Sequence, residues 1–123
     1  MLFDTTQSAL EATISGASMR QQALASNLAN VNTPGYQRVD VDFHASLSAA
    51  LDGDQDGTTQ ERLHDMRFSP EVDASGAVRA DGSTVDVDAE SAKLAANALE
   101  HQAAVQVAHV RIGILKSAMG TGF

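Results

Sequence analysis

Two heptad patterns of apolar residues, one near each end of the 123-residue chain, limit the possible fold more than any other feature. In the first pattern, alternating steps of four and three residues meet apolar side chains everywhere except at Gln7 and Gln21. This spacing keeps one stripe of a helix turned toward a partner helix. It predicts a helix from about Thr5 to Asn30, with Asp4 as its N-cap. The seam residues expected to face the partner helix are Leu10, Ile14, Ala17, Leu24, Leu28 and Val31.

The second pattern lies near the other end and is interrupted only by His101. Asp88 is the expected N-cap of this helix, and Gly120 is its expected C-terminal exit. Its predicted seam residues are Leu94, Ala98, Val105, Ala108, Ile112, Leu115 and Met119. The two patterns together predict a mainly α fold, in which long N- and C-terminal helices pair as a coiled coil.

The second helix also carries more apolar surface than one partner covers. Val107, Val110 and Ile114 lie off its seam. A helix that is apolar on several sides needs more than one neighbour. These three residues are therefore the candidate inter-subunit contacts.

Each predicted helix contains one glycine in its interior, Gly16 and Gly113. A helix tolerates such a glycine at a cost of about 1 kcal/mol relative to alanine. The alternative is a point of close helix approach or of bending. The sequence leaves both interpretations open.

The segment between the helices differs in kind. In "YQRVDVDF", Val39, Val41 and Phe43 alternate with polar residues, which predicts a half-buried strand. A short helix from Phe43 to Leu51, capped by Asp42, is expected to follow. An acidic loop at about 52–60, short strands in "LHDMRFS" and in 72–85, and a tight hairpin turn at Asp81-Gly82 complete the insert. The predicted organisation is an N-terminal helix and its stop at 1–33, a β-containing insert at 34–87 and a C-terminal helix at 88–123.

Composition narrows the function. The net charge is −8, from 16 acidic and 8 basic residues, which argues against binding to nucleic acid because the chain repels phosphate. Cysteine is absent, which excludes disulfides and thiol chemistry. The first twenty residues have neither the basic start nor the apolar run of a secretory signal or a membrane span. We therefore expect no cleaved signal peptide.

No motif predicts catalysis or a cofactor. The "DGDQDG" stretch from Asp52 copies the start of a calcium-binding EF-hand loop, but Leu63 stands where the bidentate Glu is needed, so a solvated loop is favoured. The four histidines lack the spacing of a zinc site. The "VDVD" repeats at Val39 and Val85 could pair carboxylates, but helix-capping Asp residues explain them better. We expect no enzyme, no metal and no small-molecule substrate.

The first helix ends in an emphatic stop. Thr33, Pro34, Gly35 and Tyr36 form a type II turn signal, in which the proline presets φ at the second position and the glycine supplies positive φ at the third. Asn30 is expected as a left-handed C-cap. Asn27 and Asn32 are placed to bond backbone groups freed at the helix end.

The stretch "LASNLANVNTPGYQR" resembles the N-terminal signature of the bacterial flagellar axial proteins, the rod and hook family. The "NTPGYQ" without insertion, the following "VDVDF" and the "DGSTVDVDAESAKLAANALEHQ" segment are most similar to its proximal rod members. The short insert agrees, since other members carry larger middle domains. The motif residues are Ala25, Ser26, Asn27, Asn30, Thr33, Pro34, Gly35 and Tyr36.

The resemblance implies a structural subunit of the proximal rod, which polymerises through its terminal helices. It implies partners: other copies of the chain, other rod proteins, an adaptor protein of the membrane ring, and the flagellar type III export apparatus. It also implies a periplasmic location in the basal body, export without a cleaved signal, and a role in transmitting torque. The helix-stop motif would fix the direction in which the chain leaves the first helix.

Three other interpretations remain open at this point. The chain could be a helical-hairpin adaptor or a type III secreted protein that uses the same seam to bind one partner. It could be another rod subunit of the same family. A calcium-binding module would require a calcium-dependent change that Asp54→Ala removes.

Overall fold

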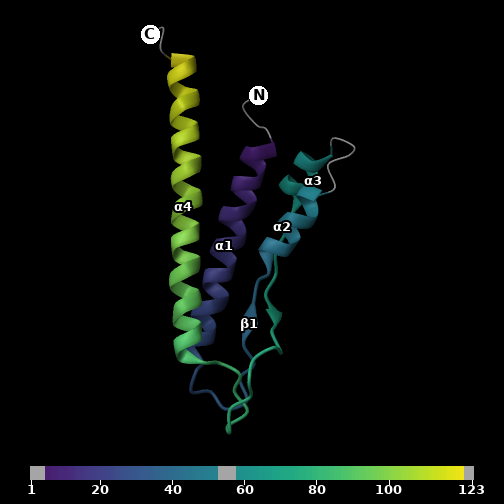
Figure 1. Ribbon diagram of the computed structural model, residues 1–123, viewed down its shortest axis with the longest axis vertical. Coiled ribbons are helices and arrows are strands. Elements are labelled where there is room, and N and C mark those ends of the chain that lie inside the picture. Colours follow the sequence, from purple (N-terminus) through teal and green to yellow (C-terminus); the bar gives the residue numbers. More distant parts are fainter. Residues whose placement is uncertain (1–4, 53–57, 121–123) are drawn as a thin grey trace.

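The computed structural model describes residues 5–52 and 58–120. Two long helices dominate it: α1 (Thr5–Ala29) and α4 (Val87–Gly120) run antiparallel and side by side (Figure 1). The end of α4 extends past the start of α1. Between them in sequence lie β1 (Val39–Asp40), α2 (Phe43–Asp52), α3 (Thr59–Asp65) and β2 (Glu71–Val72). The predicted mainly α fold with long terminal helices and a small β-containing insert is confirmed.

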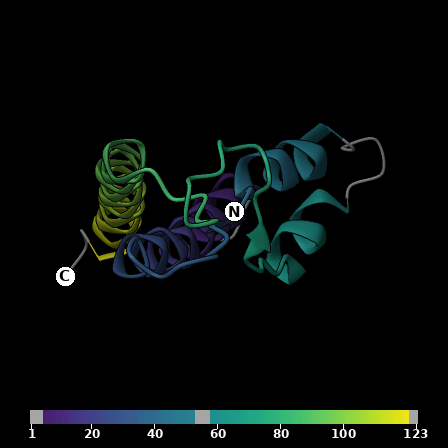
Figure 2. The ribbon, with the colours of Figure 1, turned by 90° about the horizontal axis from the view of Figure 1, so that it is seen from below.

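The insert packs on the side of α1 that faces away from α4. Seen from below, α1 lies between α4 and the pair formed by α2 and α3 (Figure 2). The two strands form an antiparallel pair, with Val39 opposite Val72 and Asp40 opposite Glu71. Helix α1 is thus the central element of the molecule.

The core lies between α1 and the insert. Phe43, at the start of α2, is completely buried with Val41, Ala17 and Ala23. Its ring meets that of Phe68 edge-on at 6.1 Å. Such a small core, built on alanines and one large aromatic side chain, needs close backbone approach to bury area efficiently.

Gly16 provides that close approach. A Cβ at this position would lie 2.6 Å from Cγ of Phe43, so only glycine fits without displacing the ring. The question left open by the sequence is therefore settled for Gly16: it allows close approach, and the approaching group is the side chain of Phe43. A Cβ added at Gly113 would meet no atom within 4 Å beyond its chain neighbours and the adjacent backbone of α4, in the described part of the chain.

One predicted helix-capping residue is found in the structure, and two predicted caps differ from it. Asp42 Oδ1 accepts the Ala45 N–H at 3.3 Å, as predicted for α2. The cap of α4 is Asp86 rather than Asp88, because its Oδ1 accepts the N–H groups of Asp88 and Ala89. Asn30 is not left-handed, since the non-glycine residues described all have negative φ. The predicted cap Asp4 lies outside the described residues.

The β content of the insert is smaller than predicted. The "YQRVDVDF" strand shortens to Val39–Asp40. The "LHDMRFS" strand is wrong, because Leu63–Asp65 end α3 and the following residues 66–70 have no regular secondary structure. Within α3, Thr59 and Leu63 are buried one helical turn apart. Residues 73–86 form loops and turns, including the predicted tight turn at 79–82, in which Gly82 has φ +84°.

Candidate functional site at the helix joint

The helix-stop motif forms a type II turn that packs against a second turn. Tyr36 N–H donates to Thr33 O at 3.2 Å, and Gly35 has φ +75°, as the sequence predicts. Gly35 N–H donates to Asp81 O at 2.9 Å. A Cβ on Gly82 would lie 3.3 Å from Cα of Gly35. The glycines therefore let two turns from distant parts of the chain approach closely.

Asn27 joins the end of α1 to β1. Its side-chain amide is fully buried and pairs with Val39 as a neighbouring strand would: Oδ1 accepts the Val39 N–H at 2.9 Å, and Nδ2 donates to Val39 O at 2.6 Å. Nδ2 also donates to Glu90 Oε1 at 2.6 Å, at the start of α4. The Tyr36 hydroxyl donates to Asn27 Oδ1 at 3.2 Å. One asparagine thus connects α1, the turn, β1 and α4.

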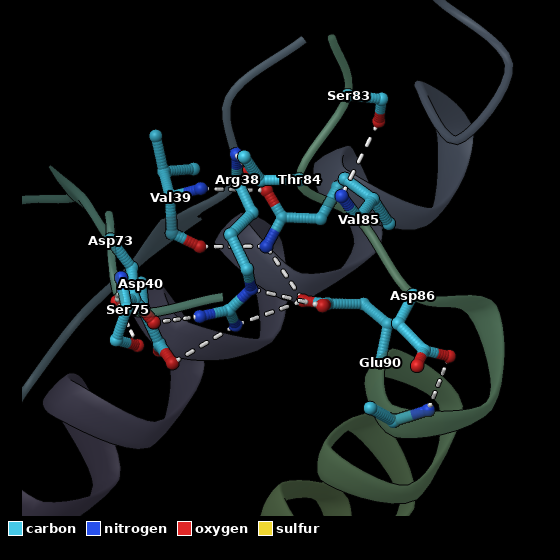
Figure 3. A network of polar contacts seen from close by, with 12 residues as sticks. Arg38, Val39, Asp40, Asp73, Ser75, Ser83, Thr84, Val85, Asp86 and Glu90 are labelled. Atoms are coloured by element: carbon cyan, nitrogen blue, oxygen red, sulfur yellow. Dashed lines mark hydrogen bonds and ion pairs between the residues drawn. The ribbon is translucent and has the colours of Figure 1, made fainter. Parts of the chain in front are cut away.

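Arg38 is the second centre of the joint (Figure 3). Its Nε donates to Glu90 Oε2 and its Nη2 to Glu90 Oε1, both at 3.1 Å, with both side chains buried. Nη2 also donates to Asp40 at 3.1 Å, and Nη1 pairs with Asp73. Arg20 of α1 donates to the other side of Asp40 at 2.8 Å. The ion pairs therefore connect α1, the two-stranded sheet and α4.

Contacts within the network favour the charged forms of Arg38, Asp40 and Asp73. Burial alone would lower the pKa of Arg38, but hydrogen bonds and charge interactions with Glu90 and Asp40 outweigh it and raise the pKa. Burial opposes ionisation of Asp40, yet its hydrogen bonds with Arg20, Val41 N–H and Arg38 lower the pKa of that carboxyl below 3.8. Two hydrogen bonds from Ser75, with Arg38 nearby, lower the pKa of Asp73.

The other motif residues lie around this joint or outside it. Asn30 Nδ2 donates to Ser26 O at 2.8 Å, and Thr33 Oγ1 donates to Asn30 Oδ1 at 3.2 Å. The Ser26 hydroxyl lies 3.4 Å from that of Tyr36. Ala25 and Pro34 are exposed. The motif thus serves the helix end and the turn, with Asn27 as its only fully buried side chain among these described residues.

Sequence reasoning missed Arg38 and Glu90. Arg38 was treated only as a polar position in an alternating strand, and Glu90 had no predicted role in the joint. The two residues are 52 positions apart, so no local pattern couples them. The available signal in the sequence is the charge of Arg38 within a predicted half-buried strand, because a buried charge needs a partner.

The predicted seam agrees with α1 better than with α4. On α1, Ala17 and Leu24 are completely buried, and Leu10, Ile14 and Leu28 are half-buried. Val31 follows the end of α1 and is also half-buried. On α4, Ala108 is buried and Leu94, Ala98 and Leu115 are half-buried.

Three predicted seam residues of α4 lie outside the intrachain interface. Val105, Ile112 and Met119 are 42, 46 and 59% exposed. The line buried in their place contains Glu90, Asn97 and Ala104, and its polar members hydrogen-bond to α1. The line of α4 that faces α1 is therefore not the predicted one. A contact of these three residues with other subunits stays a prediction.

The candidate inter-subunit residues also face outward. Val107, Val110 and Ile114 are 49, 48 and 63% exposed. Within the described ranges, no helix is long and apolar enough to span a bilayer, and no cluster of three acidic or histidine side chains is arranged to hold a metal ion. Asp54 and Asp56 of the candidate calcium loop lie outside the described residues.

These features describe a helical protein in which polar contacts fix a small insert to a pair of long helices. They are typical of a structural subunit. Residues 3–37 match a family model described as flagella basal body rod protein. The chain is 32% identical to the flagellar basal body rod protein FlgB of Aeromonas hydrophila over 117 residues, 87% of each chain. It is 30% identical to FlgB of Bacillus subtilis strain 168 over 126 residues, 98% of each.

FlgB of Salmonella typhimurium is a further relative, 36% identical over 101 residues, which cover 72% of this chain and 73% of that protein. The chain therefore belongs to the flagellar basal body rod protein family and is FlgB-like within it. It is a structural protein of the rod, in the flagellar basal body, and the family is not enzymatic.

Proposed function

We propose that this chain is a proximal rod subunit, which polymerises through its terminal helices and links the membrane ring, through an adaptor protein, to the rest of the rod. In that position it transmits motor torque. It binds other copies of itself and other rod proteins. It reaches the periplasm through the flagellar type III export apparatus, without cleavage of a signal peptide.

The observation that carries this proposal is the exposed apolar surface of α4. Eight large apolar side chains of this helix are 42 to 69% exposed: Val87, Leu99, Val105, Val107, Val110, Ile112, Ile114 and Met119. A monomeric protein rarely leaves so much apolar surface on one helix unless a partner covers it. Several sides of the helix are involved, which supports contact with more than one neighbour.

The joint supports the mechanical part of the proposal. A subunit that transmits torque must keep its insert at a constant angle to the helix pair in every copy. The buried pairs of Asn27 with Val39 and of Arg38 with Glu90 hold these parts together at several points. Such a joint resists bending better than a flexible linker would.

The test is the substitution Ile114→Lys in a strain that lacks the natural copy. Ile114 is 63% exposed, so the lone chain should fold normally, while a buried lysine at a subunit contact costs assembly. We expect normal export of the chain, measured in the periplasm and medium, but loss of rods and of swimming. Gln106→Lys, at an exposed polar position of the same helix, is the matched control and should swim.

Normal swimming of the Ile114→Lys strain would contradict the proposal. Mixing the purified chain with other rod proteins distinguishes a polymerising rod subunit from an adaptor that binds one partner. Ordered tubes support polymerisation, whereas a soluble complex of fixed stoichiometry would identify an adaptor that binds one partner.

A further inference from the structure

Helix α4 could face α1 along either of two adjacent lines. Both lines share Leu94, His101, Ala108 and Leu115. One line continues through Asn97 and Ala104, and the other through Ala98 and Val105. Successive residues lie about 100° apart around a helix, and only every second member differs between the two lines. The mean directions of the two lines therefore differ by a rotation of about 50°.

The structure uses the polar line. Asn97 and Ala104 are 1 and 7% exposed, whereas Val105 and Ile112 are 42 and 46% exposed. Burial of apolar area alone favours the other setting, because valine and isoleucine remove more apolar surface from water than alanine does. A specific interaction must therefore select the observed rotation.

Asn97 makes that interaction. Its Nδ2 donates to the backbone oxygen of Ala17 and to Gln21 Oε1 on α1, both at 2.8 Å. Its Oδ1 is buried and has no hydrogen-bond partner within the described ranges. A hydrogen bond of this kind makes a modest net contribution to stability, and both bonds to α1 are lost if Asn97 turns to solvent. Buried asparagines in helix seams can specify one arrangement of the helices in this way.

We propose that Asn97 is a positioning residue that sets the rotation of α4 against α1 and so keeps Val105 and Ile112 on the outside. In the alternative setting, Asn97 leaves the interface and loses both hydrogen bonds to α1. Glu90, bonded to Asn27 one heptad earlier, restrains the base of the helix. Asn97 extends this restraint into the part of α4 beyond the joint.

The absence of cysteine allows a direct test on the full chain in dilute solution. Single cysteines are placed at 104 and 105 by Ala104→Cys and Val105→Cys, and the rate of maleimide labelling is measured for each. With Asn97 present, we expect Cys at 105 to react about tenfold faster or more, because a buried thiol reacts only after local opening. In the Asn97→Ala background, which removes the hydrogen bonds without adding a large apolar side chain, the ratio should fall to about one or invert, since rotation exposes 104 and buries 105.

Two further variants keep the test decisive. Asn97→Asp keeps the size of the side chain but removes the Nδ2 donor, and it should shift the ratio in the same direction if alanine disturbs folding. Gln106→Ala introduces an alanine at an exposed polar position and should leave the ratio unchanged. An unchanged ratio in both Asn97 variants would overturn the inference. So would equal rates in the parent chain, since no fixed face of α4 would then pack on α1.

The labelling result concerns the chain alone and does not depend on the rod. The consequence for assembly does rest on the proposed function: Asn97→Ala should reduce rod formation by hiding Val105 and Ile112. A shifted labelling ratio with normal rods would contradict the proposed role of this surface while leaving the role of Asn97 intact.

Discussion

Gly16 of α1 packs against the side chain of Phe43, the first residue of α2. The ring is fully buried, and a Cβ on Gly16 would come within 2.6 to 2.9 Å of three of its side-chain carbons. Phe43 is the largest fully buried side chain among the described residues. The close packing of this glycine and this aromatic ring therefore holds the insert on the helix pair.

Gly16→Ala should destabilise the chain, although alanine is the better helix former. The added methyl group must displace a buried ring, and such overpacking costs about 1–3 kcal/mol. Urea unfolding followed by circular dichroism measures the change in the free energy of unfolding. Gly113→Ala is the matched control: it has open space and should stabilise the chain by up to about 1 kcal/mol. Equal effects of the two substitutions would contradict the packing argument.

The terminal helices and the turn between α1 and β1 could be predicted because their signals are local. Heptad spacing indicated α1 and α4, and the Thr33–Tyr36 turn depends on the backbone preferences of adjacent proline and glycine. The family also followed from a contiguous motif. Such features require no knowledge of what packs against them.

The remaining features depend on contacts between distant residues. The "LHDMRFS" segment resembles a strand because short apolar patterns fit either element, but its first residues, Leu63–Asp65, belong to a helix that packs on α1. Apolar periodicity indicated the wrong line of α4, because the hydrogen bonds of Asn97 to α1 outweigh the larger apolar area of Val105 and Ile112. The pairing of Arg38 with Glu90 could not be read from either sequence neighbourhood.

Replacing one member of the Arg38–Glu90 pair should be much worse than replacing an exposed charge. Glu90→Leu leaves the buried guanidinium with only Asp40 and Asp73, and we expect a loss of about 3 kcal/mol in the free energy of unfolding. The double variant Arg38→Met with Glu90→Leu should lose less than the sum of the two single variants. Denaturant titrations of all four chains give this coupling.

The exposed pair of His44 and Glu100 provides the control for that experiment. Its side chains are 53 and 37% exposed, and Glu100→Gln should change the free energy of unfolding by less than about 1 kcal/mol. A similar loss in the free energy of unfolding for the Glu90 and Glu100 variants would contradict a larger contribution of the buried ion pair to stability.

Stability should fall in acid through the carboxyl groups of the joint. The pKa of Asp40 is lower in the folded chain than its ordinary value of 3.8, so the unfolded chain takes up the proton first as the pH falls. The stabilisation from this group is complete above pH 3.8 and is lost as the pH falls through the folded pKa. Asp40→Asn should be less stable at neutral pH and should show a weaker loss between neutral pH and pH 3. Parallel pH profiles for the two chains would contradict the assignment.

Gly35→Val should impair rod assembly before it impairs export. The residue has φ +75°, which costs a side chain with a Cβ about 1–2 kcal/mol, although no atom lies within 4 Å of the position the Cβ would occupy. The strain therefore acts on the backbone and changes the direction in which the chain leaves α1, while an unfolded chain in transit does not experience it. Gly35→Asn is the matched control, because asparagine tolerates positive φ, and it should retain most assembly. The measurement compares exported chain with assembled rods in each strain, and an equal loss of both in Gly35→Val would contradict a role of this turn in orienting the insert.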